Sequence, residues 1–362
     1  MMRYIQRWYF RKFDSNEPAV FIGFILFSVL VINFFGNLFA PILAGIIIAY
    51  LLEAVVIWVA TLLNIKRTLA VYLVFFLFIT IIVLSIIFLL PQLIRQLGEF
   101  IQSIPLQLQT VQSHLYTLSD KYPKMTTHQQ LEDVVSAIGN IQLDKLASIC
   151  QDLIKFSLNS LSNVFNCLVY LFIVPLLAFF FLKDKSQIGS WFVDMLPKER
   201  GALEEVWSDV RPQLGNYVKG KTIEFIIVGI ITYIGFIYFN LNYALLLSIL
   251  VGLSVLIPYI GMVIVTIPVA LIGLDQYGVS STFLYMFLVY LTIQGLEGNL
   301  LLPLLYSGAL NLHPVAVIAA MLIFGGIWGF WGLFFAIPLA SLISSGINMW
   351  TRRNINNRSD VV

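Results

Sequence analysis

Residues 222–351 constrain this chain more than any other feature, because these 130 residues contain no Lys and no Arg. Their acidic residues are Glu224, Asp275 and Glu297, and their one histidine is His313. Prolines and glycines interrupt the stretch repeatedly, whereas a simple membrane anchor needs no helix breakers. A soluble protein cannot keep about a third of its length so poor in charge. Uncharged sequence with breaks and a few isolated polar groups is typical of a pathway through a bilayer.

Composition places the whole chain in the membrane class. Of its 362 residues, 59% are hydrophobic and 11% are charged, and the mean hydropathy is +0.91. Ordinary soluble domains carry roughly 25% charged residues. We therefore expect an all-α polytopic membrane protein. The sequence shows no basic patch with interleaved aromatic residues, so nucleic acid is not an expected partner.

Three absences in the sequence narrow the chemistry that we expect. The two cysteines, Cys150 and Cys167, have no metal-ligand spacing and form no C-x-x-C motif, so we interpret them as inert packing thiols. No Ser/His/Asp set, metal cluster or phosphate-binding loop is recognisable. We therefore expect no metal, no cofactor and no enzymatic activity.

Apolar runs long enough to cross a bilayer, about 20 residues each, define six expected transmembrane helices. They are residues 19–35, 38–63, 68–90, 156–182, 222–239 and 280–305. Gly36-Asn37 is expected to separate the first helix from the second, so that the chain reverses direction there.

Basic residues indicate the orientation of these helices. Four of them lie within residues 3–12, before the first apolar run, and no small-residue cleavage site follows, so we expect an uncleaved first span. With the N-terminus inside, all but five of the 21 Lys and Arg residues lie on the cytoplasmic side. Those five are spread through the long segment 91–155, and long segments count weakly in this rule. The C-terminus is then expected inside as well.

Two segments between the spans carry helical patterns. In the outer (periplasmic) segment 91–155, apolar residues recur at spacings of three and four, which predicts amphipathic helix. A first stripe covers residues 101–118 and a weaker one covers residues 131–146. The segment is either a helical hairpin lying on its own membrane domain or an oligomerisation element. The cytoplasmic segment 183–221 mixes basic and aromatic residues, as interfacial helices do.

The uncharged region contains an internal repeat. Shifting it by 70 residues places Ile267-Pro268-Val269-Ala270 on Ile337-Pro338-Leu339-Ala340. Each unit consists of one span, a short turn and a long apolar element broken near its middle, at 243–274 and 313–349. Two arms of about 12 residues reach about 18 Å, partway through a core of about 30 Å. We therefore favour two re-entrant helical hairpins in inverted units, with two ordinary crossings as the alternative.

Glu297 is the strongest functional candidate, because a carboxylate in an apolar span costs a few kcal/mol to insert. It must face protein, water or a cation, or carry a proton. Gln294 and Asn299 offer neutral partners beside it, and Gly298 would let another backbone approach closely. The alternative is a structural hydrogen bond to a neighbouring backbone break.

Other positions complete the expected substrate or ion pathway. The helix breakers in it are Pro258, Gly261, Pro303, Gly325, Gly326 and Pro338. His313 precedes Pro314 and is expected to begin a helix at the membrane edge, with proton handling as the alternative. Lys221 and Glu224 are spaced for an i,i+3 ion pair, and Asp275 lies in an expected solvated turn.

Several short motifs, taken together and in order, resemble one known family across nearly the whole chain. They are Phe180-Phe181-Leu182-Lys183-Asp184, Leu196-Pro197, Tyr217-Val218-Lys219-Gly220-Lys221, Leu256-Ile257-Pro258-Tyr259-Ile260-Gly261, Glu297-Gly298-Asn299-Leu300 with Pro303, Gly308 with Leu310-Asn311-Leu312-His313-Pro314, Gly325-Gly326-Ile327-Trp328-Gly329, and Ala336-Ile337-Pro338-Leu339-Ala340. They are similar to the autoinducer-2 exporter-like (AI-2E) family, also called PerM-type permeases. One departure is Lys221, where many members carry Gln.

The resemblance implies a bacterial inner-membrane transporter that forms a homo-oligomer, with a pentamer as the leading candidate. Family members are associated with export of the signalling molecule autoinducer-2, and others are described as sodium/proton antiporters. We therefore expect a secondary transporter that exports a small polar solute such as a signalling molecule. The alternatives are a sodium/proton antiporter of the same family and a passive oligomeric pore.

These expectations divide the chain into six parts and name its partners. The parts are N-terminal scaffold spans (1–90), the outer helical segment (91–155), the fourth span (156–182), the interfacial segment (183–221), the transport region with two repeat units (222–351) and a basic cytoplasmic tail (352–362). The expected partners are the lipid bilayer, a small polar solute and Na+ or H+.

Overall fold

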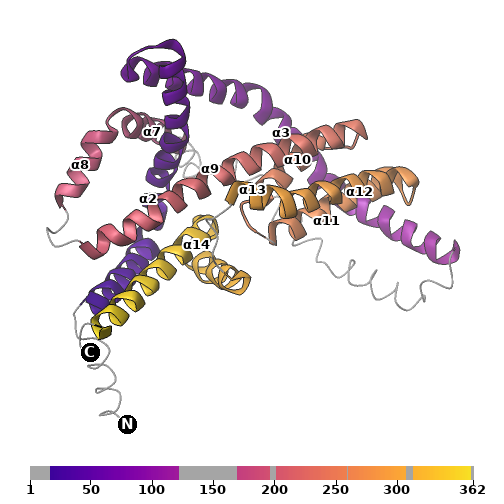
Figure 1. Cartoon of the computed structure of the whole chain (residues 1–362). Coiled ribbons are helices and arrows are strands. Elements are labelled where there is room, and N and C mark those ends of the chain that lie inside the picture. Colours follow the sequence, from indigo (N-terminus) through magenta and orange to yellow (C-terminus); the bar gives the residue numbers. More distant parts are fainter. Residues whose placement is uncertain (1–16, 122–168, 196–200, 259, 307–312, 360–362) are drawn as a thin grey trace, which may run out of the picture. The chain divides into compact units, whose positions relative to one another are not determined.

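A computed structural model describes residues 17–121, 169–195, 201–258, 260–306 and 313–359, and these residues are helical with no strand among them. The elements (Figure 1) are α2 (Glu17–Leu63), α3 (Arg67–Lys121), the π-helical η1 (Val169–Ile173), α7 (Val174–Lys183), α8 (Lys185–Met195), α9 (Gly201–Tyr238), α10 (Ala244–Ser254), α11 (Ile260–Tyr277), α12 (Ser281–Leu296), the π-helical η2 (Glu297–Leu301), α13 (Leu302–Tyr306) and α14 (Pro314–Ser359). The expected all-α class is confirmed.

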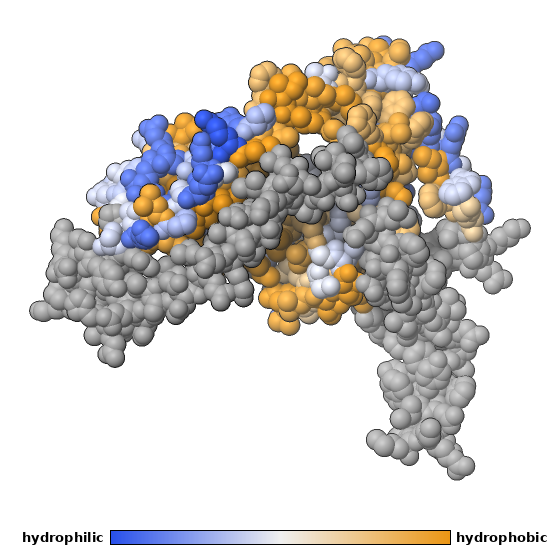
Figure 2. Space-filling view, turned by 180° about the vertical axis from the view of Figure 1, so that it is seen from behind, coloured by the Kyte–Doolittle hydropathy of each residue, from blue (hydrophilic) through white to orange (hydrophobic). Residues whose placement is uncertain are grey.

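Within the described residues, six helices are long and apolar enough to cross a membrane. They are Phe39–Leu63, Arg67–Thr110, Val210–Tyr238, Ile260–Tyr277, Ser281–Leu305 and Val315–Ser345. Hydrophobic residues cover much of the described surface that is visible in Figure 2. An apolar exterior of this kind suits lipid as the solvent, and the chain is a multi-pass membrane protein.

Three expected boundaries are not helix ends. Helix α2 continues through Gly36-Asn37, so the expected reversal there is wrong. Helix α3 continues through Pro91 into the outer segment, and α9 joins the interfacial segment to the fifth span without a break. A glycine inside a helix costs only about 1 kcal/mol, whereas unpaired backbone groups in an apolar surrounding cost several. Continuing the helix is therefore the cheaper course.

The chain divides into two compact units, which we describe separately. One unit comprises Ile48–Lys183 and Asn216–Ser307, and the other comprises Met1–Ile47, Asp184–Gly215 and Gly308–Val362. The second stripe of the outer segment and both cysteines lie outside the described residues.

In the first unit, α10 and α11 form an antiparallel hairpin. Gln276, near the end of α11, accepts a hydrogen bond from the Asn242 backbone N–H (2.7 Å) and donates one to the Asn240 carbonyl (2.8 Å), just before α10. The two ends of the broken element 243–274 therefore meet. At its tip, a Cβ added to Gly261 would collide with the Ser254 carbonyl, so only glycine fits this turn.

The hairpin belongs to the largest apolar core of this unit. The side chains that are buried there come from α9, the α9–α10 loop, α10, α11 and α12: Val228, Phe236, Leu241, Leu247, Val251, Val255, Val265, Val269, Ile272, Met286 and Tyr290. Gln96 of α3 also accepts a hydrogen bond from the Leu246 N–H at 3.0 Å. This bond satisfies one of the orphan donors in the first turn of α10.

In the other unit, α14 bends sharply at Gly329 and is drawn as two arms in Figure 1. Gly329 has φ 58° and ψ −132°, a backbone conformation that favours glycine. Beside the bend, a Cβ on Gly332 would collide with the Phe324 carbonyl. Ser254 and Phe324 are 70 residues apart. The same close approach therefore recurs at the repeat distance that the sequence predicts.

Candidate functional site

A buried ion pair lies on one face of α9. Lys221 Nζ is 2.8 Å from Glu224 Oε2, and the two side chains are 3% and 0% exposed. The spacing of three residues places both on the same side of the helix. The ion pair expected from the sequence is confirmed. Its burial is not what an interfacial pair would show, because both groups have been removed from water.

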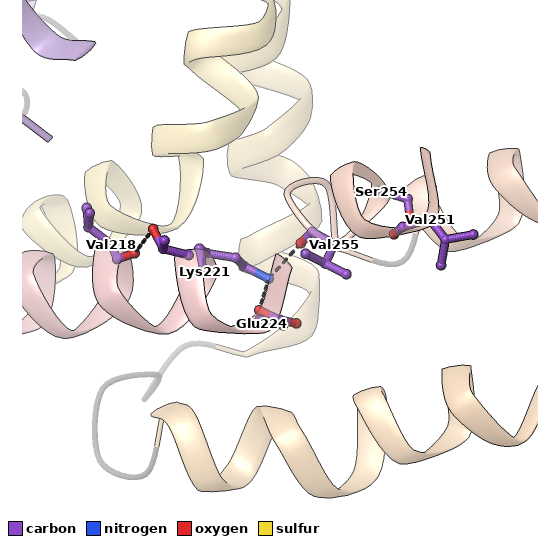
Figure 3. A network of polar contacts seen from close by, with 7 residues as sticks. Val218, Lys221, Glu224, Val251, Ser254 and Val255 are labelled. Atoms are coloured by element: carbon purple, nitrogen blue, oxygen red, sulfur yellow. Dashed lines mark hydrogen bonds and ion pairs between the residues drawn. The ribbon is translucent and has the colours of Figure 1, made fainter. Parts of the chain in front are cut away.

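The Lys221 ammonium also donates a hydrogen bond to the carbonyl of Val255, at 2.7 Å (Figure 3). Val255 is the C-cap residue of α10, at the tip of the α10–α11 hairpin. The last carbonyls of a helix have no partner within it, and the helix dipole makes that end negative. A cation is therefore well placed there, and here the protein supplies one from a different helix.

Glu297 brings a second carboxyl group to the pair. Its side chain is hydrogen-bonded to Glu224 and lies within electrostatic reach of Lys221. A direct hydrogen bond between two carboxyl groups requires a proton on one of them, since an ionised carboxylate has no donor. With that proton, the three side chains sum to zero charge. We refer to Lys221, Glu224 and Glu297 as the charged cluster.

The backbone at Glu297 is irregular. Helix α12 ends at Leu296, and Glu297 opens the π-helical segment η2. Short π-helical segments inside α-helices often occur at functional sites. The charged cluster thus gathers a buried turn of α9, the end of α10 and the start of a π-helical segment.

Two buried polar groups are found on the helices that carry the cluster. Gln294, one turn before Glu297, is 5% exposed, and Thr232 on α9 is 0% exposed. Among the described residues, Gln294 Nε2 and Thr232 Oγ1 have no hydrogen-bond partner. An unsatisfied buried donor costs about 1–3 kcal/mol. Such a cost is understandable in a transporter when the groups contact a polar solute during part of the cycle.

Other residues expected in the pathway near Glu297 lie apart from the cluster or turn away from it. Asn299 is exposed and donates to the Gly295 carbonyl of its own helix at 2.8 Å. Gly298 and Pro303 are exposed, and a Cβ on Gly298 would meet nothing within 4 Å. Their expected role as pathway residues remains a prediction.

The remaining expected residues form the two bends. Pro258 and Gly261 lie at the α10–α11 tip. In the other unit, Gly325 and Gly326 precede the Gly329 bend, and Pro338 is buried in the second arm of α14.

His313 is exposed, and its Nδ1 accepts a 3.3 Å hydrogen bond from the Val315 N–H at the start of α14. The expectation that His313-Pro314 begins a helix is therefore confirmed.

The sequence missed Val255 and Thr232 as members of the site. Val255 contributes only its backbone carbonyl, and no side-chain pattern identifies the last carbonyl of a helix. Thr232 could have been found from its spacing of eight residues after Glu224, which keeps both on nearly the same helix face. Among the described residues, no group of three His, Cys, Asp or Glu side chains could hold a metal ion.

Comparison with known proteins identifies the family. The family description "AI-2E family transporter" matches residues 22–352. "Putative permease PerM" of Escherichia coli (strain K12) is 40% identical over 350 residues, which cover 97% of this chain and 98% of that protein. "Putative transport protein YueF" of Bacillus subtilis (strain 168) is 28% identical over 87% of this chain and 84% of its own. "AI-2 transport protein TqsA" of Escherichia coli (strain K12) is 23% identical over 91% of each. The chain belongs to the AI-2E transporter family and is a membrane transport protein.

Proposed function

We propose that this protein is a secondary transporter that exports a small polar solute across the bacterial inner membrane and couples this export to protons at the charged cluster. The observation that carries the proposal is the burial of Lys221, Glu224 and Glu297 among apolar helices, against the tip of a helical hairpin. Charged groups in such surroundings are costly and are typical of ion pathways. The homo-oligomeric state that the resemblance implies belongs to the same proposal.

The geometry links the charge of the cluster to the position of the hairpin. When Glu224 and Glu297 share one proton, the cluster is neutral and can stay buried. When that proton leaves, the cluster carries one negative charge in apolar surroundings, which is unfavourable unless water reaches it. The Val255 carbonyl at the hairpin tip is bonded to the same ammonium. Loss of the proton therefore favours a different position of the tip, as alternating access requires.

A small polar solute suits the uncharged polar groups near the cluster. Gln294 Nε2 and Thr232 Oγ1 are buried donors without a partner among the described residues. A solute with hydroxyl or carbonyl oxygens would satisfy both donors. One relative bears the name "AI-2 transport protein", which makes AI-2 the first solute to test.

The test uses the purified full chain in liposomes loaded with AI-2, with and without a pH gradient. We expect efflux that accelerates under the gradient, and we expect Glu297→Gln to remove that acceleration, because the amide cannot release a proton. Glu99→Gln is the matched control, since Glu99 is an exposed carboxylate on α3. Gradient-driven efflux that is unchanged in Glu297→Gln would remove the cluster from the coupling mechanism.

Sodium/proton exchange is the second candidate. It is favoured by two carboxyl groups in contact beside a backbone carbonyl, because hard cations take oxygen ligands of these kinds. The measurement is sodium uptake into the same liposomes at several pH values. A pH-dependent sodium flux would favour exchange, and no sodium flux at any pH would exclude it.

A further inference from the structure

The Lys221 ammonium occupies a position that has the character of a cation site. It is surrounded by a carboxylate oxygen of Glu224 at 2.8 Å and the Val255 carbonyl oxygen at 2.7 Å. In transporters, backbone carbonyls at the ends of broken helices coordinate small cations near the substrate. Here the carbonyl comes from the end of α10 and the ammonium comes from α9, as Figure 3 shows.

This ammonium is a fixed part of the protein. The Lys221 side chain is 3% exposed, and its attachment to α9 prevents it from diffusing away. Lys219, two residues earlier on the same helix, differs in both respects, because it is exposed and lies over the ring of Tyr50 at 5.1 Å. The two lysines therefore provide a buried and an exposed amine on one helix.

We infer that Lys221 is a tethered cation that takes the place of a bound sodium ion, so that the charged cluster works without sodium. The inference rests on the proposed function in treating this cluster as the coupling site. It determines the coupling ion, because a site already filled by an ammonium group has protons left to exchange. It also disfavours sodium/proton exchange in the natural protein.

Charge balance says what removal of the amine should do. With Lys221 present and one proton shared by Glu224 and Glu297, the cluster is neutral. In Lys221→Gln the same protonation state carries one negative charge beside the Val255 carbonyl. The shorter glutamine leaves space where Nζ was and adds an amide oxygen. A sodium ion then restores neutrality and finds oxygen ligands from Glu224, Val255 and the new side chain.

The experiment measures the thermal unfolding midpoint of the purified full chain in detergent, as sodium chloride replaces choline chloride at constant ionic strength. The natural protein and the matched control Lys219→Gln should show no sodium-dependent shift. Lys221→Gln should show a saturable rise of a few degrees, because a ligand that binds only the folded state stabilises it. Lys221→Gln combined with Glu224→Gln should lose that rise.

Two outcomes would overturn the inference. One is a sodium-dependent rise in the natural protein that Glu224→Gln abolishes, since the site would then accept sodium beside the lysine. The other is the lack of any sodium effect in both Lys221→Gln and the smaller Lys221→Ser, whichever of them folds. These readouts involve no transport, so failure of the proposed function, seen as gradient-driven efflux by Glu297→Gln, can be told apart from failure of this inference.

Discussion

At the scale of single residues, the ion pair between Lys221 and Glu224 is a costly feature that the fold retains. Removing one partner of a buried pair leaves an uncompensated charge and typically costs about 3–5 kcal/mol. We therefore expect Glu224→Gln to lower the free energy of unfolding by about 3 kcal/mol. Adding Lys221→Met should recover much of this loss, because the double variant buries no lone ammonium. Unfolding by sodium dodecyl sulfate, followed by circular dichroism, measures both.

A double variant that is as unstable as Glu224→Gln plus Lys221→Met taken separately would contradict this account. The two residues would then contribute independently.

Gln294 gives the second prediction at this scale. Its buried Nε2 has no partner among the described residues, so replacing it with the apolar methionine should raise the free energy of unfolding by about 1 kcal/mol. If the amide serves the solute, the same change should slow AI-2 efflux from liposomes several-fold. The exposed Gln92→Met on α3 is the control. A more stable Gln294→Met variant with unchanged efflux would show that the amide does not contact the solute.

Part of the cluster can be read from the sequence. A carboxylate in an apolar span draws attention by its insertion cost, and the i,i+3 spacing of Lys221 and Glu224 predicts their pairing. The contact of Glu297 with Glu224 depends on how α12 packs against α9, which residue spacing within one helix cannot give. The Val255 carbonyl is invisible in principle, since every residue has one.

At the scale of elements, the two hairpin bends depend on close backbone approach at Gly261 and Gly332. Gly261→Ala and Gly332→Ala should each lower the free energy of unfolding by roughly 1–3 kcal/mol, because the added methyl group collides with a carbonyl oxygen that belongs to a helix. Gly98→Ala on α3 is the control, since a Cβ there meets nothing within 4 Å. Alanine should be neutral or stabilising at that position. Equal effects at all three positions would mean that the bends do not need glycine.

The sequence predicts the breaks in the transport region better than the ends of the scaffold helices. The breaks at Pro258 to Gly261 and at Gly325 to Gly329 combine several helix-disfavouring residues, and each becomes a bend. At Gly36-Asn37 and at Pro91 the same residue types stay inside continuous helices. One breaker is tolerated where packing or lipid favours helix, so isolated breakers are weak signals.

At the scale of the whole molecule, the prediction concerns the side of the membrane on which each loop lies. The two ends of the broken element meet through Gln276, Asn240 and Asn242, so a hairpin that enters and returns leaves both ends on one face. One full span, α12, then separates them from His313. Reporter positions that are exposed are Asn242, Val279 and His313.

Single cysteines at these three positions, in a background with Cys150 and Cys167 replaced by serine, test this arrangement in sealed vesicles with a membrane-impermeant maleimide. Cysteines at 242 and 279 should react from the same side, and a cysteine at 313 should react only from the opposite side or after permeabilisation. Reaction of 242 and 279 from opposite sides would show that residues 243–274 cross the bilayer. The two repeat units would then not be inverted, and gating by two oppositely facing hairpins would have no structural basis.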